Sequence, residues 1–224
     1  MHWPVGKGPH DEKYTFDFVS TWRAMSVLAT RPNPRVRFIG ISNFAPAQLD
    51  ALLAVREVVK PKVHQFETHP YLPQEEWLER HREVGIRVTA YSPLGNMNPT
   101  YGARDTSAFT SSFSSFSSSL PSFEYNHADL PLLLHHPVVK DVAKETGCSP
   151  AQVVLKWGMQ RGASVIPKSM HEAYIEENFR AQECVLLEDN VKRVDRVGRR
   201  DGPRRFNNPS KGWGVKLFEE LDDA

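Results

Sequence analysis

Four short apolar segments, separated by longer stretches with helical periodicity, constrain the fold of this chain most. The segments are rich in β-branched residues and are bounded by turn or helix signals, so we expect buried strands there. They are residues 36–41, 63–68, 86–91 and 163–166. Alternating strands and helices of these lengths predict parallel pairing through right-handed crossovers. The fold class is therefore α/β, either a barrel or a doubly wound sheet, and the pattern does not choose between the two.

Helix signals between these segments support the alternation. Residues 46–59 carry an apolar stripe with helical spacing. A clear helix start lies further along, where Ser149 is the N-cap, Pro150 the first helical residue, and Gln152 completes a capping box. The preceding helix is expected over residues 137–146. Two of the helices are thus separated by a well-marked boundary.

Two regions break this rhythm within a chain that otherwise reads as a single domain, residues 1–224. Residues 106–123 are mostly Ser with interspersed Phe, so we expect a disordered or loosely packed insertion. The alternative is a marginal helix docked through the phenylalanines. Residues 199–224 are rich in Arg, Asn, Pro and Gly, which indicates an irregular tail anchored by Trp213 and Phe218.

Composition narrows the class of ligand and partner. The formal net charge of the 224 residues is +1, which gives no field to recruit nucleic acid or an acidic membrane. A small ligand is the better expectation. Cys148 and Cys184 are too few for a metal site, and two thiols in a long chain suggest a reducing compartment. Since no stretch suits a bilayer span or secretory signal, we expect a cytoplasmic protein.

Polar residues follow each predicted strand, at the end where α/β proteins bind ligands. The segments are 40–44, 64–71, 90–95 and 165–169. In this order and spacing, with Glu177 and Asn178 after the last, they resemble the aldo-keto reductase family. The resemblance covers almost the whole chain outside the Ser-rich run. It implies a (β/α)8 barrel, which resolves the ambiguity left by the strand pattern.

The same resemblance implies a nicotinamide dinucleotide as the cofactor. Ser42, Asn43 and Gln65 match positions that hydrogen-bond the nicotinamide carboxamide, a group with both a donor and an acceptor. Tyr91 matches the aromatic residue that stacks on the nicotinamide ring. Taken singly, each has an ordinary structural alternative, such as a turn asparagine or a core tyrosine. The ordered set is what favours the cofactor.

The remaining cofactor contacts are implied by three further sets. They are Ser92, Leu94 and Gly95 over the pyrophosphate, Lys168 and Ser169 around the adenosine 2′-phosphate, and Glu177 and Asn178 at the adenine, with Ile166 as a further cofactor contact. The family commonly has an Arg six positions after the Lys, where this chain has Tyr174. Because Tyr lacks the charge that grips a phosphate, preference for NADPH over NADH is weakened. NADP(H) is the first expectation and NAD(H) the alternative.

The first residues of the chain resemble the end of the family's fourth barrel strand. His2 matches the His that orients the substrate carbonyl, and it is the one catalytic candidate. No residue matches the family's Asp, Tyr and Lys, and the first three βα units are missing, so we expect an incomplete barrel from a truncated gene model or a splice product. The insertion at 106–123 is then a candidate retained intron. Trp3 and Trp213 resemble substrate-pocket aromatics, or else seal the flank of the barrel.

The function implied by the resemblance is NAD(P)H-dependent reduction of an aldehyde, ketone or aldose carbonyl by hydride transfer. Without the proton donor, we expect this chain to be inactive. Two alternatives stay open: a non-catalytic dinucleotide-binding or regulatory subunit, and an unstable fragment. The expected partners are a small carbonyl substrate and a second copy of the chain, because a partial barrel leaves strand edges open. Nucleic acid and membranes are not expected partners.

Overall fold

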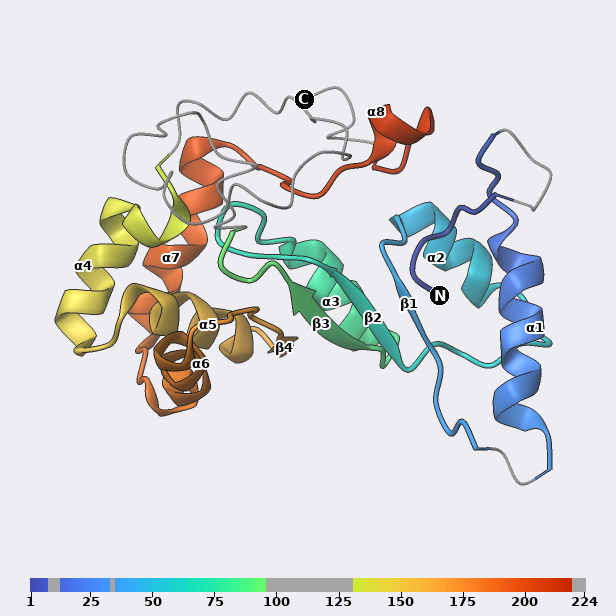
Figure 1. Cartoon of the computed structure of the whole chain (residues 1–224), viewed down its shortest axis with the longest axis horizontal. Coiled ribbons are helices and arrows are strands. Elements are labelled where there is room, and N and C mark those ends of the chain that lie inside the picture. Colours follow the sequence, from blue (N-terminus) through green and yellow to red (C-terminus); the bar gives the residue numbers. More distant parts are fainter. Residues whose placement is uncertain (8–12, 33–34, 96–130, 219–224) are drawn as a thin grey trace.

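The computed structural model describes residues 1–7, 13–32, 35–95 and 131–218, and within them the strands form one parallel sheet (Figure 1). The strands are β1 (Gly40–Ser42), β2 (Val63–Glu67), β3 (Arg87–Tyr91) and β4 (Ala163–Val165), in the spatial order β1-β2-β3-β4. Every neighbouring pair is parallel. The predicted α/β class with parallel strands is confirmed.

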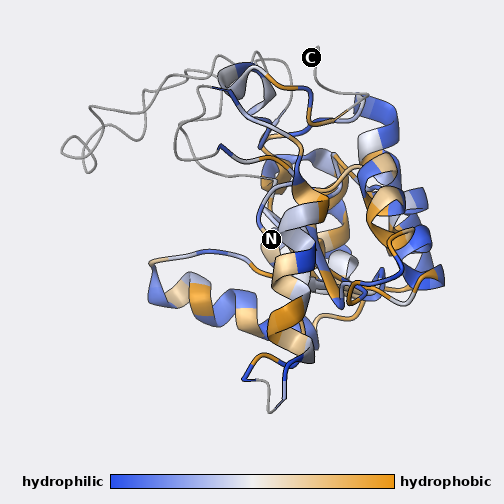
Figure 2. Cartoon of the chain, turned by 90° about the vertical axis from the view of Figure 1, so that its right-hand side faces the viewer, coloured by the Kyte–Doolittle hydropathy of each residue, from blue (hydrophilic) through white to orange (hydrophobic). Residues whose placement is uncertain are grey.

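Helices separate the strands along the chain. They are α1 (Phe18–Thr30), α2 (Pro46–Leu53), α3 (Glu75–Glu83), α4 (Pro137–Thr146), α5 (Pro150–Gln160), α6 (Glu172–Phe179), α7 (Glu188–Asp201) and α8 (Ser210–Trp213), with 3-10 turns η3 (Leu133–His135) and η4 (Arg180–Glu183). In Figure 1, α1 and α2 lie beside β1, whereas α4 to α7 gather beyond β4. Figure 2 shows hydrophobic and hydrophilic residues alternating along these helices, as amphipathic packing requires.

Buried apolar side chains form three clusters in the described residues. One joins α1, β1 and α2 around Trp22 and Leu49, and a second joins β2, β3 and α3 around Phe66 and Leu78. The third, around Trp157, packs α4, α5 and α7 together. The sheet is thus supported by separate clusters along its width.

The predicted bounds of α4 and the predicted start of α5 are confirmed, and so is the capping box between them. The N–H of Gln152 donates to Ser149 Oγ at 3.2 Å, and Ser149 N–H donates to Gln152 Oε1 at 3.0 Å. Two of the backbone donors at this helix start are therefore satisfied reciprocally. Local sequence sufficed here because the signal is entirely local.

Three other boundaries differ from the prediction by more than one residue. β1 begins at Gly40, not at residue 36. A Cβ on Gly40 would lie 2.6 Å from Val63 O, so the missing side chain leaves room for the first pair of the two strands. α2 ends at Leu53, six residues early, because Val59 turns to α1 and its carbonyl accepts the Trp22 indole N–H at 2.8 Å. α7 continues to Asp201, into the expected irregular tail.

Cys148 and Cys184 form a disulfide, so the expectation of two free thiols was wrong. The turn between α4 and α5 packs against the end of η4 and brings the two Cα atoms to 5.9 Å across a separation of 36 residues. Spacing in the sequence gives no sign of that contact. The argument for a reducing compartment therefore loses its basis. Among the described helices, none has the length and apolar character needed to cross a membrane.

The start of the tail is positioned by a close contact of α7. A Cβ on Gly198 would lie 2.5 Å from Pro70 O, so this glycine lets α7 rest directly on the loop that follows β2. The N–H of Arg204 then donates to Tyr71 O at 2.9 Å. The chain after α7 is thereby directed back toward the end of β2, where the candidate site lies.

The first residues of the chain lie beside β1, at one edge of the sheet. The amino group of Met1 donates to Gly40 O at 2.7 Å. No strand among the described residues pairs with the outer edge of β4. The predicted insertion at 106–123 lies outside the described residues, as does the tail beyond Phe218. The single-domain and tail boundaries stay predictions.

Candidate functional site

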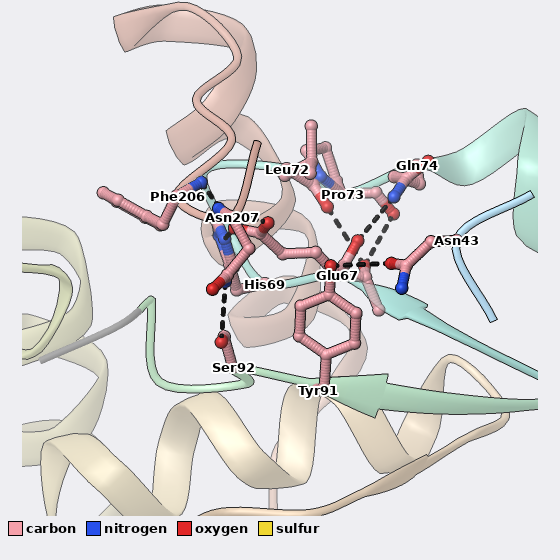
Figure 3. A network of polar contacts seen from close by, with 11 residues as sticks. Asn43, Glu67, His69, Leu72, Pro73, Gln74, Tyr91, Ser92, Phe206 and Asn207 are labelled. Carbon is pink, nitrogen blue, oxygen red and sulfur yellow. Dashed lines mark hydrogen bonds and ion pairs between the residues drawn. The ribbon is translucent and has the colours of Figure 1, made fainter. Parts of the chain in front are cut away.

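Polar residues from three strands meet at the carboxyl edge of the sheet. Asn43 follows β1, Glu67 ends β2 and Tyr91 ends β3, with Glu67 paired in register with Tyr91. Figure 3 shows these side chains directed toward one another across the strand ends. Parallel strands end at one edge, so residues far apart in sequence meet without any loop having to carry them there.

Asn43 is the central residue of this group. Its backbone is left-handed, with φ of 61°, a conformation that Asn tolerates better than most residues. Its N–H donates to Gln65 O at 3.0 Å, and its Oδ1 accepts the Tyr91 hydroxyl at 2.8 Å. Its Nδ2 donates to Ser42 Oγ at 3.1 Å and to His2 O at 3.2 Å. Through its side chain and its backbone N–H, Asn43 thus connects four other predicted positions.

The Tyr91 phenol stays neutral in this setting. Burial raises its pKa well above the ordinary value, and the negative charge of Glu67 raises it further, while Arg205 partly opposes the rise. A neutral phenol can donate its proton in a hydrogen bond, as it does to Asn43. The hydrogen bond of the Tyr91 hydroxyl to Asn43 thus fixes the position of the aromatic ring.

Glu67 is fully buried and was not predicted as a site residue. Its Oε1 contacts His69 Nε2 at 2.9 Å and accepts the Phe206 N–H at 2.7 Å, while Oε2 accepts the Asn207 N–H at 2.9 Å. Burial alone would raise its pKa, but the His69 contact, the charge of Arg205 and the Phe206 N–H together lower it. A carboxylate held this way binds the tail to the end of β2. Its only sequence signal is an acidic residue at the end of an apolar strand.

The loop after β3 is tied to the same tail. Asn207 Nδ2 donates to Ser92 Oγ at 3.0 Å (Figure 3). Ser92 is left-handed, with φ of 47°, and its carbonyl accepts the Gly95 N–H at 2.9 Å, closing a turn in which Gly95 also has positive φ. Leu94 packs against the apolar cluster around Trp157. The loop predicted to cover a pyrophosphate is therefore a fixed turn.

Aromatic side chains from the first residues of the chain and from α8 and the residues after it meet one another. Trp3 contacts Trp213 edge to face at 5.1 Å between ring centroids, and Phe218 at 6.1 Å. Tyr14 stacks on Trp213 with 4.8 Å between ring centroids. The predicted pair Trp3 and Trp213 is thus brought together, in an arrangement compatible with a pocket wall and with a seal of the barrel flank. The imidazole of His2 is exposed beside Trp3.

A second group of predicted residues lies between β4 and α6. Lys168, Ser169 and Asn178 line an open cavity of about 840 Å³, whose other walls include Val165 and Phe179. β4 adjoins the first group, because the Ile166 N–H donates to Ala90 O at 3.2 Å. The two groups therefore occupy one edge of one sheet.

Two residues predicted for this second group, Ile166 and Glu177, do not line the cavity, and neither does Tyr174, which stands where the family commonly has an Arg. Ile166 and Tyr174 are exposed, at 46% and 57% of their surface, and Glu177 is only partly exposed. The carbonyl of Glu177 accepts Gln152 Nε2 at 3.2 Å, which fixes α6 to α5. α6 buries none of its residues. This part of the site is open to solvent. The group around Asn43, Glu67 and Tyr91, here called the strand-end cluster, is closed by its own hydrogen bonds.

Comparison with known proteins bears on the whole chain. The model of the Aldo/keto reductase family matches residues 1–199. An uncharacterised oxidoreductase of Schizosaccharomyces pombe is 34% identical, with 100% of this chain and 63% of that protein covered. The D/L-glyceraldehyde reductase of Hypocrea jecorina is 33% identical, with the same coverages.

A solved structure gives the corresponding result in three dimensions. Aldose reductase from Giardia lamblia superposes with a TM-score of 0.73 at 28% identity, over 98% of this chain and 66% of that one. The chain therefore spans less than two thirds of the length of these proteins. The four parallel strands correspond to part of a (β/α)8 barrel, and the predicted partial barrel is confirmed.

Proposed function

Because this chain belongs to the aldo/keto reductase family, we propose that it binds a reduced nicotinamide dinucleotide along the carboxyl edge of β1 to β4. The site would serve reduction of an aldehyde or ketone carbonyl to an alcohol. The observation that carries this proposal is the convergence of Asn43, Gln65 and Tyr91 at one edge, with the cavity at Lys168 on the neighbouring strand. Glyceraldehyde reduction by a relative suggests small aldehydes as substrates.

The strand-end cluster is suited to the nicotinamide. Asn43 and Ser42 are already bonded to each other, and among the described residues the Gln65 side chain has no hydrogen-bond partner. A free primary amide matches the donor and acceptor of a carboxamide. We assign Tyr91 to stacking on the nicotinamide ring, since its hydroxyl is held by Asn43.

The remaining contacts extend from the Ser92 turn to α6. The turn that ends at Gly95 would approach the pyrophosphate through its backbone. Lys168 and Ser169 would meet the 2′-phosphate of NADP(H), with Ile166 beside them and Glu177 and Asn178 at the adenine. Lys168 is a single exposed charge, and Tyr174 supplies none, so NAD(H) is expected to bind as well.

The bound dinucleotide supplies a hydride to the carbonyl carbon. We assign His2 to orienting the carbonyl oxygen by a hydrogen bond from its exposed imidazole, with Trp3 and Trp213 as the apolar wall. None of the tyrosines of this sequence stands in the family's proton-donor motif. We therefore propose that the 224-residue chain holds the cofactor with little turnover, which keeps a non-catalytic binding role as the second candidate.

A titration of the purified chain with NADPH and NADH tests this proposal. We expect saturable binding of one cofactor per chain and little oxidation of NADPH in the presence of glyceraldehyde. Gln65→Met should weaken binding about tenfold, which equals about 1.4 kcal/mol. Gln160→Met is the matched control, because that amide lies outside the site on α5.

The outcomes separate the candidates. Binding without turnover supports the proposal, and rapid turnover shows that the chain is itself a reductase. A chain that melts cooperatively but binds neither cofactor refutes the cofactor assignment. A chain that neither binds nor melts is an unstable fragment on its own.

A further inference from the structure

Two buried histidines behind the strand-end cluster have no place in the function proposed above. His64 lies on β2, next to Gln65, and is fully buried. His81 lies on α3 and is 1% exposed. The Nδ1 atom of His64 is 2.7 Å from Nε2 of His81. Paired imidazoles in an apolar interior need a defined arrangement of protons, because each ring has one donor and one acceptor when neutral.

The hydrogen-bond chain defines that arrangement. The Phe44 N–H donates to His64 Nε2 at 3.1 Å, so the proton of His64 must be on Nδ1, facing His81. His81 then accepts at Nε2 and carries its own proton on Nδ1, which donates to Trp77 O at 2.6 Å. Every donor has one acceptor, and the tautomers of both rings follow from the network. An additional proton on either Nε2 would face another N–H.

This chain of hydrogen bonds ends at the turn after β1, which carries Asn43 and Phe44. Consecutive N–H groups of this turn, those of Asn43 and Phe44, are bound by consecutive residues of β2, the Gln65 carbonyl and the His64 ring. A left-handed residue other than glycine is sparsely populated and needs its neighbours to hold it. The His64 ring supplies one of these two holds. Its loss would leave the buried Phe44 N–H without an acceptor.

We propose that His64 and His81 form a neutral relay that positions the Asn43 turn for the nicotinamide carboxamide, so that cofactor affinity falls when either ring is protonated. The ligand in this inference rests on the proposed function. Both histidines are positioning residues, since they act through the turn and touch no proposed cofactor atom.

The surroundings of the pair oppose protonation. The aromatic rings of Phe66 and Trp77 lie 4.9 Å from His64 and 4.3 Å from His81, between centroids. Burial lowers the pKa of His64 well below its ordinary range, and a proton on His81 would lower it further. Burial also lowers the pKa of His81, partly opposed by the Trp77 carbonyl and assisted by Arg80.

The charges around the relay are limited to α2 and α3. Arg80 is the only charged group besides the two rings that acts on the pair among the described residues, and it is paired with Asp50 of α2 at 3.0 Å. The turn after β1 contributes the Phe44 backbone and ring, and β2 contributes Phe66. No described carboxylate contacts either imidazole, so a proton there has no counter-ion.

The test compares variants of His64 in their binding of NADH, which lacks the 2′-phosphate and so avoids the titration of that group. His64→Asn places a neutral amide oxygen where it can accept the Phe44 N–H, and His64→Leu offers no acceptor. His135→Gln is the control, because His135 is exposed on η3. Binding is measured from about pH 8 to about pH 5, on both sides of the ordinary histidine pKa.

We expect the dissociation constant of the unchanged protein to stay level through the ordinary histidine pKa and to rise only toward the acid end, because the lowered pKa values of both rings delay their protonation. His64→Asn should bind normally at neutral pH and lose that rise. His64→Leu should bind about tenfold more weakly at all pH values. His135→Gln should follow the unchanged protein. A folded His64→Leu variant that binds NADH normally overturns the proposal.

Two measurements without ligand keep this outcome distinct from a failure of cofactor binding. Nitrogen-15 spectra of the imidazoles should show both rings protonated on Nδ1, and a proton on Nε2 of His64 overturns the relay. Amide hydrogen exchange at Asn43 and Phe44 should speed up in His64→Leu. If the protein binds no NADH at all, the proposed function fails, and unchanged exchange in this variant would still refute the positioning role.

Discussion

The two halves of the candidate site are built in opposite ways. Around Asn43, Glu67 and Tyr91, buried polar groups are bonded to one another before any ligand is present. Around Lys168 and α6, side chains are exposed and the cavity is open. A preformed polar cluster favours a fixed orientation of its ligand, whereas an exposed charge contributes affinity with little geometric demand. In the proposed function, the nicotinamide is oriented and the adenosine end is held loosely.

The largest change in the free energy of unfolding is expected for the open half of the site, the part around Lys168 and α6. There the disulfide joins η4 to the turn before α5. Replacement of both Cys148 and Cys184 by Ser should lower the free energy of unfolding by about 3–4 kcal/mol, because it frees a loop of 36 residues in the unfolded chain. Urea denaturation measures the loss. A reducing agent should reproduce it in the unchanged protein and leave the double variant unaffected. An unchanged protein insensitive to reduction would mean that the open half needs no covalent support.

The next effect is on the closed half. Glu67→Gln keeps the shape but turns an amide nitrogen toward a backbone N–H, since two such groups and His69 converge on this carboxylate. The free energy of unfolding should fall by about 3 kcal/mol in urea denaturation. Glu57→Gln, an exposed residue after α2, should change it by less than about 0.5 kcal/mol. Equal losses in both variants would contradict the description of a closed half.

The same carboxylate predicts the response to acid. The pKa of Glu67 is lowered in the folded protein, so its contribution to stability is present above the ordinary value of 4.5 and is lost as the pH falls through the folded value. The relay of His64 and His81 acts at higher pH. Their lowered pKa values mean that the unfolded chain takes up protons first as the pH falls below 6.5, which reduces stability there.

A smaller effect is expected for the link between Tyr91 and Asn43. Tyr91→Phe removes the 2.8 Å hydrogen bond to Asn43 Oδ1 and keeps the ring, so unfolding should become easier by about 1 kcal/mol. Thermal and urea denaturation both measure it. Tyr174→Phe, exposed on α6, is the matched control and should be neutral. If the two variants behave alike, the hydroxyl of Tyr91 does not hold the cluster.

The smallest change in stability is expected for Lys168→Ala, within about 0.5 kcal/mol, because the side chain is exposed. Affinity for NADPH should still fall about tenfold, while affinity for NADH stays constant. Calorimetric titration with both cofactors measures the difference. An equal loss for both would place Lys168 away from the 2′-phosphate.

Local signals in the sequence predicted those parts of the structure that depend on local contacts. The capping box at Ser149 and the strand ends at Asn43 and Tyr91 were predicted from residues within a few positions. Glu67 was missed because its function depends on residues 206 and 207, which reach it only through the fold. The disulfide was missed for the same reason, and α1 because its anchor is Trp22, bound to a distant carbonyl.

The absence of a side chain at position 198 has a consequence at a distance. α7 lies flush with the loop after β2 only because Gly198 adds nothing between them. A single methyl group there would act as a wedge, tilting the helix and carrying residues 206 and 207 off the carboxylate that they cap. The position of residues 206 and 207 at the candidate site therefore depends on Gly198 having no Cβ.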